Sequence, residues 1–286
     1  MTGRGPLIND EVQNGVLIMD GATGTVNTNT FSNMAYIPET WWSAGIMFLD
    51  SGGSATSNII TDCQIGVIFQ DGSGSAQGNT ITGGTVGLLG IWAQYTKSGT
   101  WTATFVGNTI NQARDSLGYE NGAIGAQSWN EGASITVTID NNQLLGNGST
   151  SADGIFIGDF PEYEPAGSIA AIITDNVISG WQHGIRLVSS VTEATITGNT
   201  ISNNVGTDSG VHIDPAINVN NIHINYNNIF GNNATGTYGI FNNGVGALDA
   251  SHNWWGHPTG PYHPELNPSG KGDKTSNYVD FEPWLL

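Results

Sequence analysis

The chain is poor in cysteine and in basic residues. Its 286 residues include one cysteine, Cys63, and only six lysines and arginines against 24 aspartates and glutamates, a formal net charge of −18. A single cysteine excludes an intrachain disulfide and leaves the redox compartment open. We expect Cys63 to be a buried apolar residue rather than a nucleophile. A surface this acidic repels nucleic acid and anionic membranes, and it disfavours polyanionic glycans such as pectate or alginate unless Ca²⁺ bridges the like charges.

Long apolar runs are also missing. No stretch is long enough for a transmembrane helix, and no apolar signal segment stands near the first residue. We therefore expect no membrane insertion. The acidic surface likewise predicts no nucleic-acid partner.

What the chain does contain is a phrase repeated nine times, in which an asparagine has an apolar residue three positions before it and another two positions after it. The asparagines are Asn29, Asn58, Asn79, Asn108, Asn142, Asn176, Asn199, Asn227 and Asn253. The spacing varies, from 21 residues between Asn58 and Asn79 to 34 between Asn108 and Asn142. A fixed phrase with variable spacers indicates one supersecondary unit stacked many times, with insertions in its loops.

A second phrase alternates with the first and predicts strands. It is a small residue followed by alternating apolar residues, as in Gly45–Phe48, Gly66–Phe69, Gly154–Ile157, Gly184–Leu187 and Gly210–Ile213. A repeat of 21 residues is too short for a βαβ unit, which needs about 30. The sequence therefore predicts an all-β fold, a right-handed parallel β-helix (solenoid) of about nine to ten coils. Its coils should lie about 4.8 Å apart, with the asparagines stacked into a ladder along one edge.

Several segments resemble a known superfamily. They are Gly78–Ile81, Gly107–Ile110 and Gly198–Asn204 in the repeats, and Asn253–Gly256 and Asp280–Leu285 at the end. In these segments the chain resembles the right-handed parallel β-helix repeat proteins of the pectin-lyase-like superfamily, in particular its uncharacterised secreted members. The resemblance implies the fold and a secreted protein. It does not select an activity, because the superfamily includes lyases, hydrolases, epimerases, adhesins and inert spacers.

The domain organisation follows from the repeats. We expect one domain, with the β-helix in residues 1–256 and a capping tail of the same domain in residues 257–286. The natural plug residues for the last coil are Trp254, Trp255, Trp284 and Leu285. Thr2–Gly5 looks like the tail of a phrase whose start is missing, so we expect the sequence to begin mid-coil within a longer protein. If the chain is one domain of a longer secreted protein, we expect it outside the cell or at the cell surface.

Three successive insertions predict a wall of loops. From the second phrase to the next asparagine the chain takes 13 residues after Gly45 and Gly66, but 21 after Gly87, 19 after Ala123 and 22 after Gly154. The lengthened loops on coils three to five carry the candidate ligand-binding residues Trp92, Tyr95, Trp101, Trp129, Glu131, Phe160, Glu162, Tyr163 and Glu164. Aromatic faces beside carboxylates suit sugars, which offer apolar C–H faces and hydroxyl donors. The alternative is that these aromatics, like Tyr36, Trp41 and Trp42 of an earlier insertion, only pin long loops onto the solenoid.

One outward column of the second-phrase strands holds the candidate catalytic residues. The column reads Met47, Ile68, Leu89, Gly125, Phe156, Arg186, His212 and Phe241. Its apolar first half could be covered by a loop or by a second copy in a homo-oligomer. In its second half Arg186, His212 and Asp214, with Asp159 from two coils earlier, could supply a base, a cation and carboxylates. The alternative is a salt-bridged surface ladder.

Metal sites are less well supported. Asp20, Asp50 and Asp71 share one column at a strand end, which is ordinary turn chemistry but could collect Ca²⁺. His252, His257 and His263 near the cap match no metal-binding spacing and are better explained as loop histidines. No cofactor is certain, with Ca²⁺ the one candidate.

Two classes of function remain open on the sequence. The first is an extracellular or cell-surface module that binds a polysaccharide or other glycan, or serves as a scaffold, through the loop wall. The second is a polysaccharide-degrading enzyme, a lyase or a glycoside hydrolase, with its site on the same face. The scarcity of basic residues and the absence of a complete catalytic signature favour the first.

Overall fold

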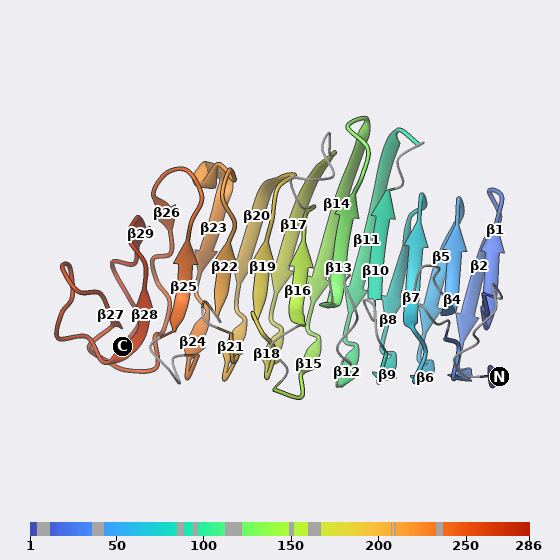
Figure 1. The fold of residues 1–286 in the computed structure, drawn as a ribbon, viewed down its shortest axis with the longest axis horizontal. Coiled ribbons are helices and arrows are strands. Elements are labelled where there is room, and N and C mark those ends of the chain that lie inside the picture. The colour runs from blue at the N-terminus through green and yellow to red at the C-terminus, as the bar shows by residue number, and fades with distance from the viewer. Residues whose placement is uncertain are drawn as a thin grey trace.

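The computed structural model is a parallel β-helix in which three sheets run the length of the molecule (Figure 1). The described residues are 1–4, 12–35, 43–84, 89–93, 97–111, 122–148, 152–159, 167–206, 208, 210–232 and 237–286. Each coil up to β24 contributes one strand to each sheet, and all the long ladders are parallel. The coils wind in the right-handed sense expected for parallel crossovers, which confirms the predicted fold class.

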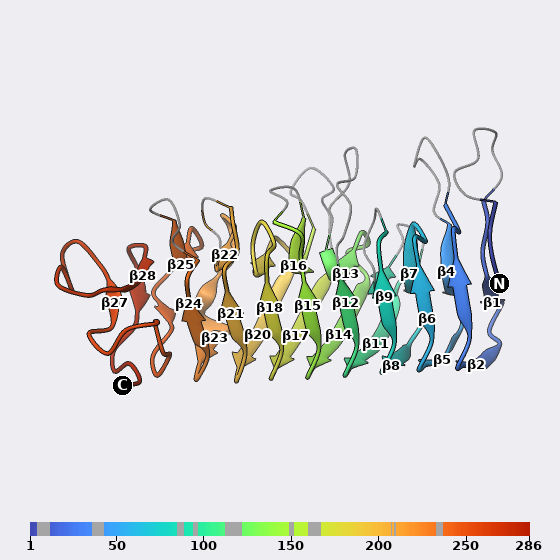
Figure 2. The same ribbon diagram turned by 90° about the horizontal axis from the view of Figure 1, so that it is seen from below.

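The strands fall into the three sheets as follows. The first sheet contains, in spatial order, β1 (Val16–Met19), β4 (Ala44–Leu49), β7 (Ile65–Gln70), β10 (Leu89–Ala93), β13 (Gly122–Ser128), β16 (Asp153–Ile157), β19 (Ile185–Leu187), β22 (Val211–Ile213), β25 (Tyr238–Asn242), β28 (Gly272–Thr275) and β27 (Pro261–Tyr262). The second contains β2 (Thr23–Asn27), β5 (Gly52–Thr56), β8 (Gly74–Gln77), β11 (Gly99–Val106), β14 (Ala133–Asp140), β17 (Ser168–Thr174), β20 (Val191–Thr197), β23 (Ile222–Asn225), β26 (Leu248–Asp249) and β29 (Val279–Asp280). The third, seen in Figure 2, contains β3 (Thr30–Ser32), β6 (Ile59–Thr61), β9 (Thr80–Thr82), β12 (Thr109–Asn111), β15 (Gln143–Leu145), β18 (Val177–Ser179), β21 (Thr200–Ser202) and β24 (Asn228–Phe230). A 3₁₀ turn, η2 (Val219–Asn221), precedes β23.

The core is built from the apolar positions that flank each asparagine. The residues three before it all lie in the interior: Val26, Ala55, Ala76, Phe105, Ile139, Ile173, Ile196, Ile224 and Ala250. The residues two after it do so as well: Phe31, Ile60, Ile81, Ile110, Leu144, Ile178, Ile201, Ile229 and Trp255. Each set stacks on its copies in the next coil, so burial of one apolar phrase per coil drives the winding.

The asparagine ladder is continuous from Asn29 to Asn253, and from Asn58 onward its members are buried. At Asn108, Oδ1 accepts from both the backbone N–H and the side-chain amide of Asn79, at 3.0 Å each. Its own amide donates to the carbonyl of Ala76 at 3.0 Å and to Oδ1 of Asn142 at 2.9 Å. Every donor and acceptor of this buried side chain is therefore used.

A second, shorter ladder was not predicted. Asn204 Oδ1 accepts from the backbone N–H of Trp181, and Asn232 Oδ1 accepts from the backbone and side-chain N–H groups of Asn204. The ladder ends on Asp273, whose Oδ2 accepts from the backbone and the amide of Asn232 at 2.9 Å each. An aspartate can end such a ladder because an ionised carboxylate accepts hydrogen bonds and leaves no donor unpaired.

Two sequence-based placements are wrong. Leu89 does not belong to the outward column of the first sheet: it pairs with Val67 and Ile124, and Gly90 is the residue opposite Ile68 and Gly125. The predicted register of this strand was therefore wrong by one residue, and because side chains alternate between the two faces of a strand, residues predicted to face outward face inward and vice versa. Ile91 accordingly lies in the core.

At the C-terminal end, Leu285 is 37% exposed and does not plug the last coil, whereas Trp255 and Phe281 are buried and Trp284 packs against the core. Leu285 follows the last paired strand, β29, and the aromatic rings of Trp255 and Phe281 are in the core in its place. Cys63 is buried as expected, and burial raises the pKa of its thiol to about 11.

The ladder predicts that replacing one of its asparagines by alanine lowers the free energy of unfolding by an amount that depends on the position. Asn108→Ala leaves the backbone N–H and the amide of Asn79 and the carbonyl of Ala76 without partners, so we expect it to lower the free energy of unfolding by at least about 3 kcal/mol. Asn29→Ala removes one bond, to the carbonyl of Asn27, at an exposed position and should cost less than about 1 kcal/mol. Urea unfolding followed by circular dichroism measures both, and equal losses would contradict the ladder's role.

Candidate functional site

Three side chains from neighbouring coils lie side by side on the outward face of the first sheet. Arg186 in β19 pairs in register with His212 in β22, and His212 pairs with Phe241 in β25. Figure 1 shows these strands as neighbours in the C-terminal half of the solenoid. Adjacent strands are about 4.8 Å apart, so the three side chains form one row across the coils.

Asp214 holds Arg186 and His212 together. The Arg186 guanidinium donates to both carboxylate oxygens, from Nε at 3.1 Å and from Nη2 at 2.8 Å. His212 Nε2 lies 2.9 Å from Asp214 Oδ1. Burial raises the pKa of Asp214, but the hydrogen bonds from His212 and Arg186 outweigh burial and lower it from 3.8 to about 2. Asp214 is therefore ionised at neutral pH, and three of its roughly four lone-pair sites are used by its own neighbours.

A second histidine–carboxylate pair lies beside the first. His183 and Asp153 are both buried, and His183 Nδ1 lies 2.7 Å from Asp153 Oδ1. The rings of His183 and His212 are 5.0 Å apart between centroids. The other nitrogen of His212, Nδ1, is buried and lies 3.6 Å from Asp208 Oδ2, beyond hydrogen-bond distance.

Asp159 does not join this cluster. It is completely buried, and its Oδ2 accepts from the backbone N–H of Ser128 at 2.9 Å. Ser128 belongs to the coil on the N-terminal side, whereas Asp214 lies on the C-terminal side of Asp159. Oδ2 of Asp159 thus bonds to the end of β13, in the coil on the far side of Asp159 from the Arg186–His212–Asp214 cluster.

The loop wall is present in part. The insertions lengthen the strands as well as the loops, because β11 and β14 have eight residues each where β2 and β5 have five. Of the predicted wall residues, Tyr95, Phe160, Glu162, Tyr163 and Glu164 lie outside the described residues, as do Tyr36, Trp41 and Trp42.

The described wall residues serve several purposes. Trp92 is buried against Ile68, so this part of the apolar column is covered within the chain. Trp129 stacks on Trp92, with ring centroids 6.1 Å apart, and remains half-buried. Trp101 packs against the core, and Glu131 is exposed. Within this part of the wall, Trp129 and Glu131 are the side chains best placed to meet a ligand.

The aspartate column has the backbone geometry of turns. Asp20, Asp50 and Asp71 all have left-handed φ angles, of 58°, 51° and 51°. The ammonium group of Lys97 forms an ion pair with Asp50. Across the described part of the chain, no group of three or more histidine, cysteine, aspartate or glutamate side chains is arranged to hold a metal ion.

The cap histidines are engaged separately. His252 stacks on Tyr226, His257 Nδ1 lies 2.9 Å from the Thr259 hydroxyl, and His263 Nδ1 accepts from the backbone of Glu265 and Leu266.

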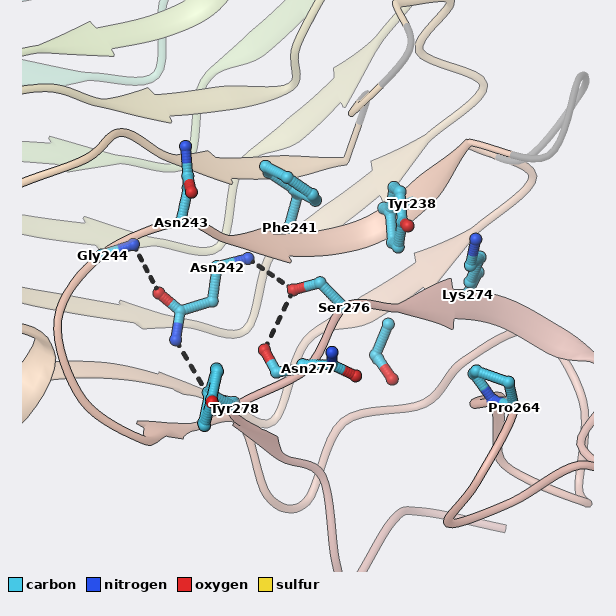
Figure 3. A pocket seen from close by; sticks show the side chains of 11 residues that line it. Tyr238, Phe241, Asn242, Asn243, Gly244, Pro264, Lys274, Ser276, Asn277 and Tyr278 are labelled. Atoms are coloured by element: carbon cyan, nitrogen blue, oxygen red, sulfur yellow. Dashed lines mark hydrogen bonds between the residues drawn. The ribbon is translucent and has the colours of Figure 1, made fainter.

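Sequence reasoning missed a pocket next to the row (Figure 3). The pocket has a volume of ≈ 410 Å³ and continues the outward face of the first sheet toward the cap. It is lined by Tyr238, Phe241, Asn242, Asn243, Gly244, Pro264, Lys274, Thr275, Ser276, Asn277 and Tyr278. The Phe241 ring links it to the cluster, 5.3 Å from His212 and 5.0 Å from Tyr238 between centroids.

The pocket depends on how the cap docks. Lys274 stands opposite Tyr238 because β28 pairs with β25, and its ammonium group lies 4.2 Å from the centre of the Tyr238 ring. The outward aromatics of the strand Tyr238–Asn242 were a usable signal. The pairing with β28, which completes the pocket, has no counterpart in the repeat phrase.

Comparison with known proteins adds no further constraint. No family model, no curated protein and no solved structure matches the chain. Among the described residues, no helix has the length and apolar character needed to cross a bilayer.

The low pKa of Asp214 predicts an acid-sensitive contribution to stability. The pKa is lower in the folded than in the unfolded chain, so the contribution is complete above about pH 4 and is lost as pH falls toward about 2. At neutral pH it amounts to about 2 kcal/mol. We expect Asp214→Asn to lower the free energy of unfolding by this amount at pH 7 and by little at pH 2.

Urea unfolding at both pH values tests this. Glu265→Gln, at an exposed carboxylate, serves as the control and should change stability by less than about 0.5 kcal/mol. A deficit of Asp214→Asn that stays constant from pH 7 to pH 2 would contradict the assigned ion pairs.

Proposed function

We propose that this protein is an extracellular or cell-surface module that recognises glycans on the outward face of its first sheet without cleaving them. The observation that carries the proposal is the pocket between β25 and the cap, where three aromatic rings stand beside side-chain amides and a lysine. Aromatic faces bind the C–H faces of sugars, and amides bind their hydroxyl groups. The resemblance to the pectin-lyase-like superfamily, whose members include glycan-processing proteins, supports the same class of ligand.

The polar row beside the pocket supports binding more than catalysis. Arg186 and His212 each bond to Asp214, and none of the three lines the pocket. An ionised Asp214 with three hydrogen-bonding donors around it is a poor proton donor at neutral pH. Glycoside hydrolases need two carboxylates aimed at one bond, and Asp159 is directed toward Ser128 instead.

The loop wall offers a second contact surface for the same ligand. Trp129 and Glu131 lie in the turn after β13, a strand of the same sheet that is several coils away from the pocket. A glycan long enough to run along the outward face would meet the pocket at one end and the wall at the other.

An enzyme remains the second candidate, on one specific observation. Two histidines, each beside a carboxylate, face one another with centroids 5.0 Å apart. Such a pair could pass a proton to and from a bound sugar. A lyase or hydrolase of this kind would release unsaturated or reducing chain ends, and Arg186→Ala or His212→Ala would abolish that release.

A glycan screen tests the proposal. We expect binding without new chain ends, and we expect Phe241→Ala to weaken binding by about tenfold or more through loss of the ring. Tyr226→Ala removes an aromatic ring that is 58% exposed but lies outside the pocket, and it should bind as the wild type does. Cleavage that depends on His212 would replace this proposal with the enzyme, and equal binding by both aromatic variants would place the ligand elsewhere.

A further inference from the structure

The pocket beside the cap has the opposite electrostatic character to the rest of the chain. The protein carries 24 acidic and six basic residues. The eleven residues that line the pocket include Lys274 and no aspartate or glutamate. With acidic residues four times as frequent as basic ones, a pocket without carboxylates that contains a lysine favours anionic ligands over cationic ones.

Lys274 has no carboxylate partner among the residues that the structure describes. Its ammonium group lies over the Tyr238 ring, and within the described residues no carboxylate comes within ion-pair distance of it. Its neighbour Asp273 faces the interior, where it accepts hydrogen bonds from Gly231 and Asn232. Successive residues of a strand point to opposite faces, so the carboxylate and the ammonium group are kept apart.

Several polar groups of the pocket have no partner within the described parts of the chain. The hydroxyl of Thr275 is buried and makes no hydrogen bond there. The side-chain amides of Asn243 and Asn277 are exposed. Asn242 and Ser276, in contrast, bond to each other and to the surrounding backbone, which shapes the wall of the pocket (Figure 3). The pocket thus combines a rigid frame, one cation and free amides.

We infer that this pocket binds a sugar unit that carries a single negative charge, a carboxylate or a sulfate ester, within an otherwise neutral glycan. The charged group lies against Lys274, the ring packs against Tyr238 and Phe241, and the hydroxyl groups meet Asn243 and Asn277. A volume of ≈ 410 Å³ lies toward the lower end of the range of about 300–1,000 Å³ usual for small-ligand sites. A polyanion fits poorly, because its further charges would face the acidic remainder of the protein.

This inference rests on the proposed function and is tested with monosaccharides on the full chain. Glucuronate and glucose 6-sulfate probe the two anionic groups, and glucose is the neutral reference, all by titration calorimetry or ligand-observed NMR. We expect at least one anionic sugar to bind about tenfold more tightly than glucose, and the difference to shrink in 0.5 M NaCl. Polyglucuronate should bind no more tightly per sugar unit than glucuronate.

Matched lysine variants show whether a preference for anionic sugars comes from Lys274 in the pocket or from the overall charge of the cap. Lys274→Met should reduce affinity for the anionic sugar to that for glucose, and Lys274→Arg should restore most of it. Lys271→Met removes the same charge from an exposed residue of the same cap segment that does not line the pocket, and it should stay within about twofold of the wild type. Circular dichroism confirms that the variants are folded.

The outcomes distinguish this inference from the proposed function. If glucose and glucuronate bind equally, Lys274→Met has no effect and Phe241→Ala abolishes both, the glycan module stands and the anionic pocket is wrong. If no sugar binds the folded wild type, both are wrong. If Lys271→Met weakens binding as much as Lys274→Met, the preference comes from the cap's overall charge and the assignment to the pocket fails.

Discussion

The rest of the structure depends on the buried asparagine ladder. A buried amide is costly unless both of its donors and its acceptor are used, and stacking at the spacing of parallel strands uses all of them. Asn108 illustrates this, because its side chain bonds to the coil before it and to the coil after it. A coil shifted along its neighbour would break these bonds, so the ladder fixes register at one corner of every coil and leaves the loops elsewhere free to vary in length.

Fixed register is also what assembles the candidate site. Arg186, His212 and Phe241 are each more than twenty residues apart in sequence, yet they lie side by side because their coils are in register. The second ladder acts in the same way at the C-terminal end. Asp273 ends it, and this bond anchors β28 so that the next residue, Lys274, reaches the ring of Tyr238. The position of Lys274 at the pocket is therefore a consequence of how a buried polar ladder terminates.

The sequence predicts the features that repeat and misses those that occur once. The asparagines, both sets of flanking apolar residues and the row of Arg186 and His212 follow from periodicity, which is a local property. The slip at Leu89 could not be read because Leu88, Leu89 and Ile91 are all apolar, so the sequence alone does not say at which residue the strand alternation begins. The direction of Asp159 and the pocket depend on which loop or cap strand packs beside them, and single segments leave no periodic signal.

Three cations of the protein differ in whether they form an ion pair: Arg186 and Lys97 do, and Lys274 does not do so among the described residues. Arg186 is held by both oxygens of Asp214, and Lys97 by Asp50, so neither cation is available to a ligand without breaking an existing pair. Breaking the Arg186 pair would leave the carboxylate partly buried and poorly compensated, which is costly. Lys274 has an aromatic ring as its neighbour instead, and a cation over a ring keeps most of its charge for a second partner. The one lysine of the pocket therefore lies at the cap, where the repeat ends, and the repeating coils provide the rigid surface beside it.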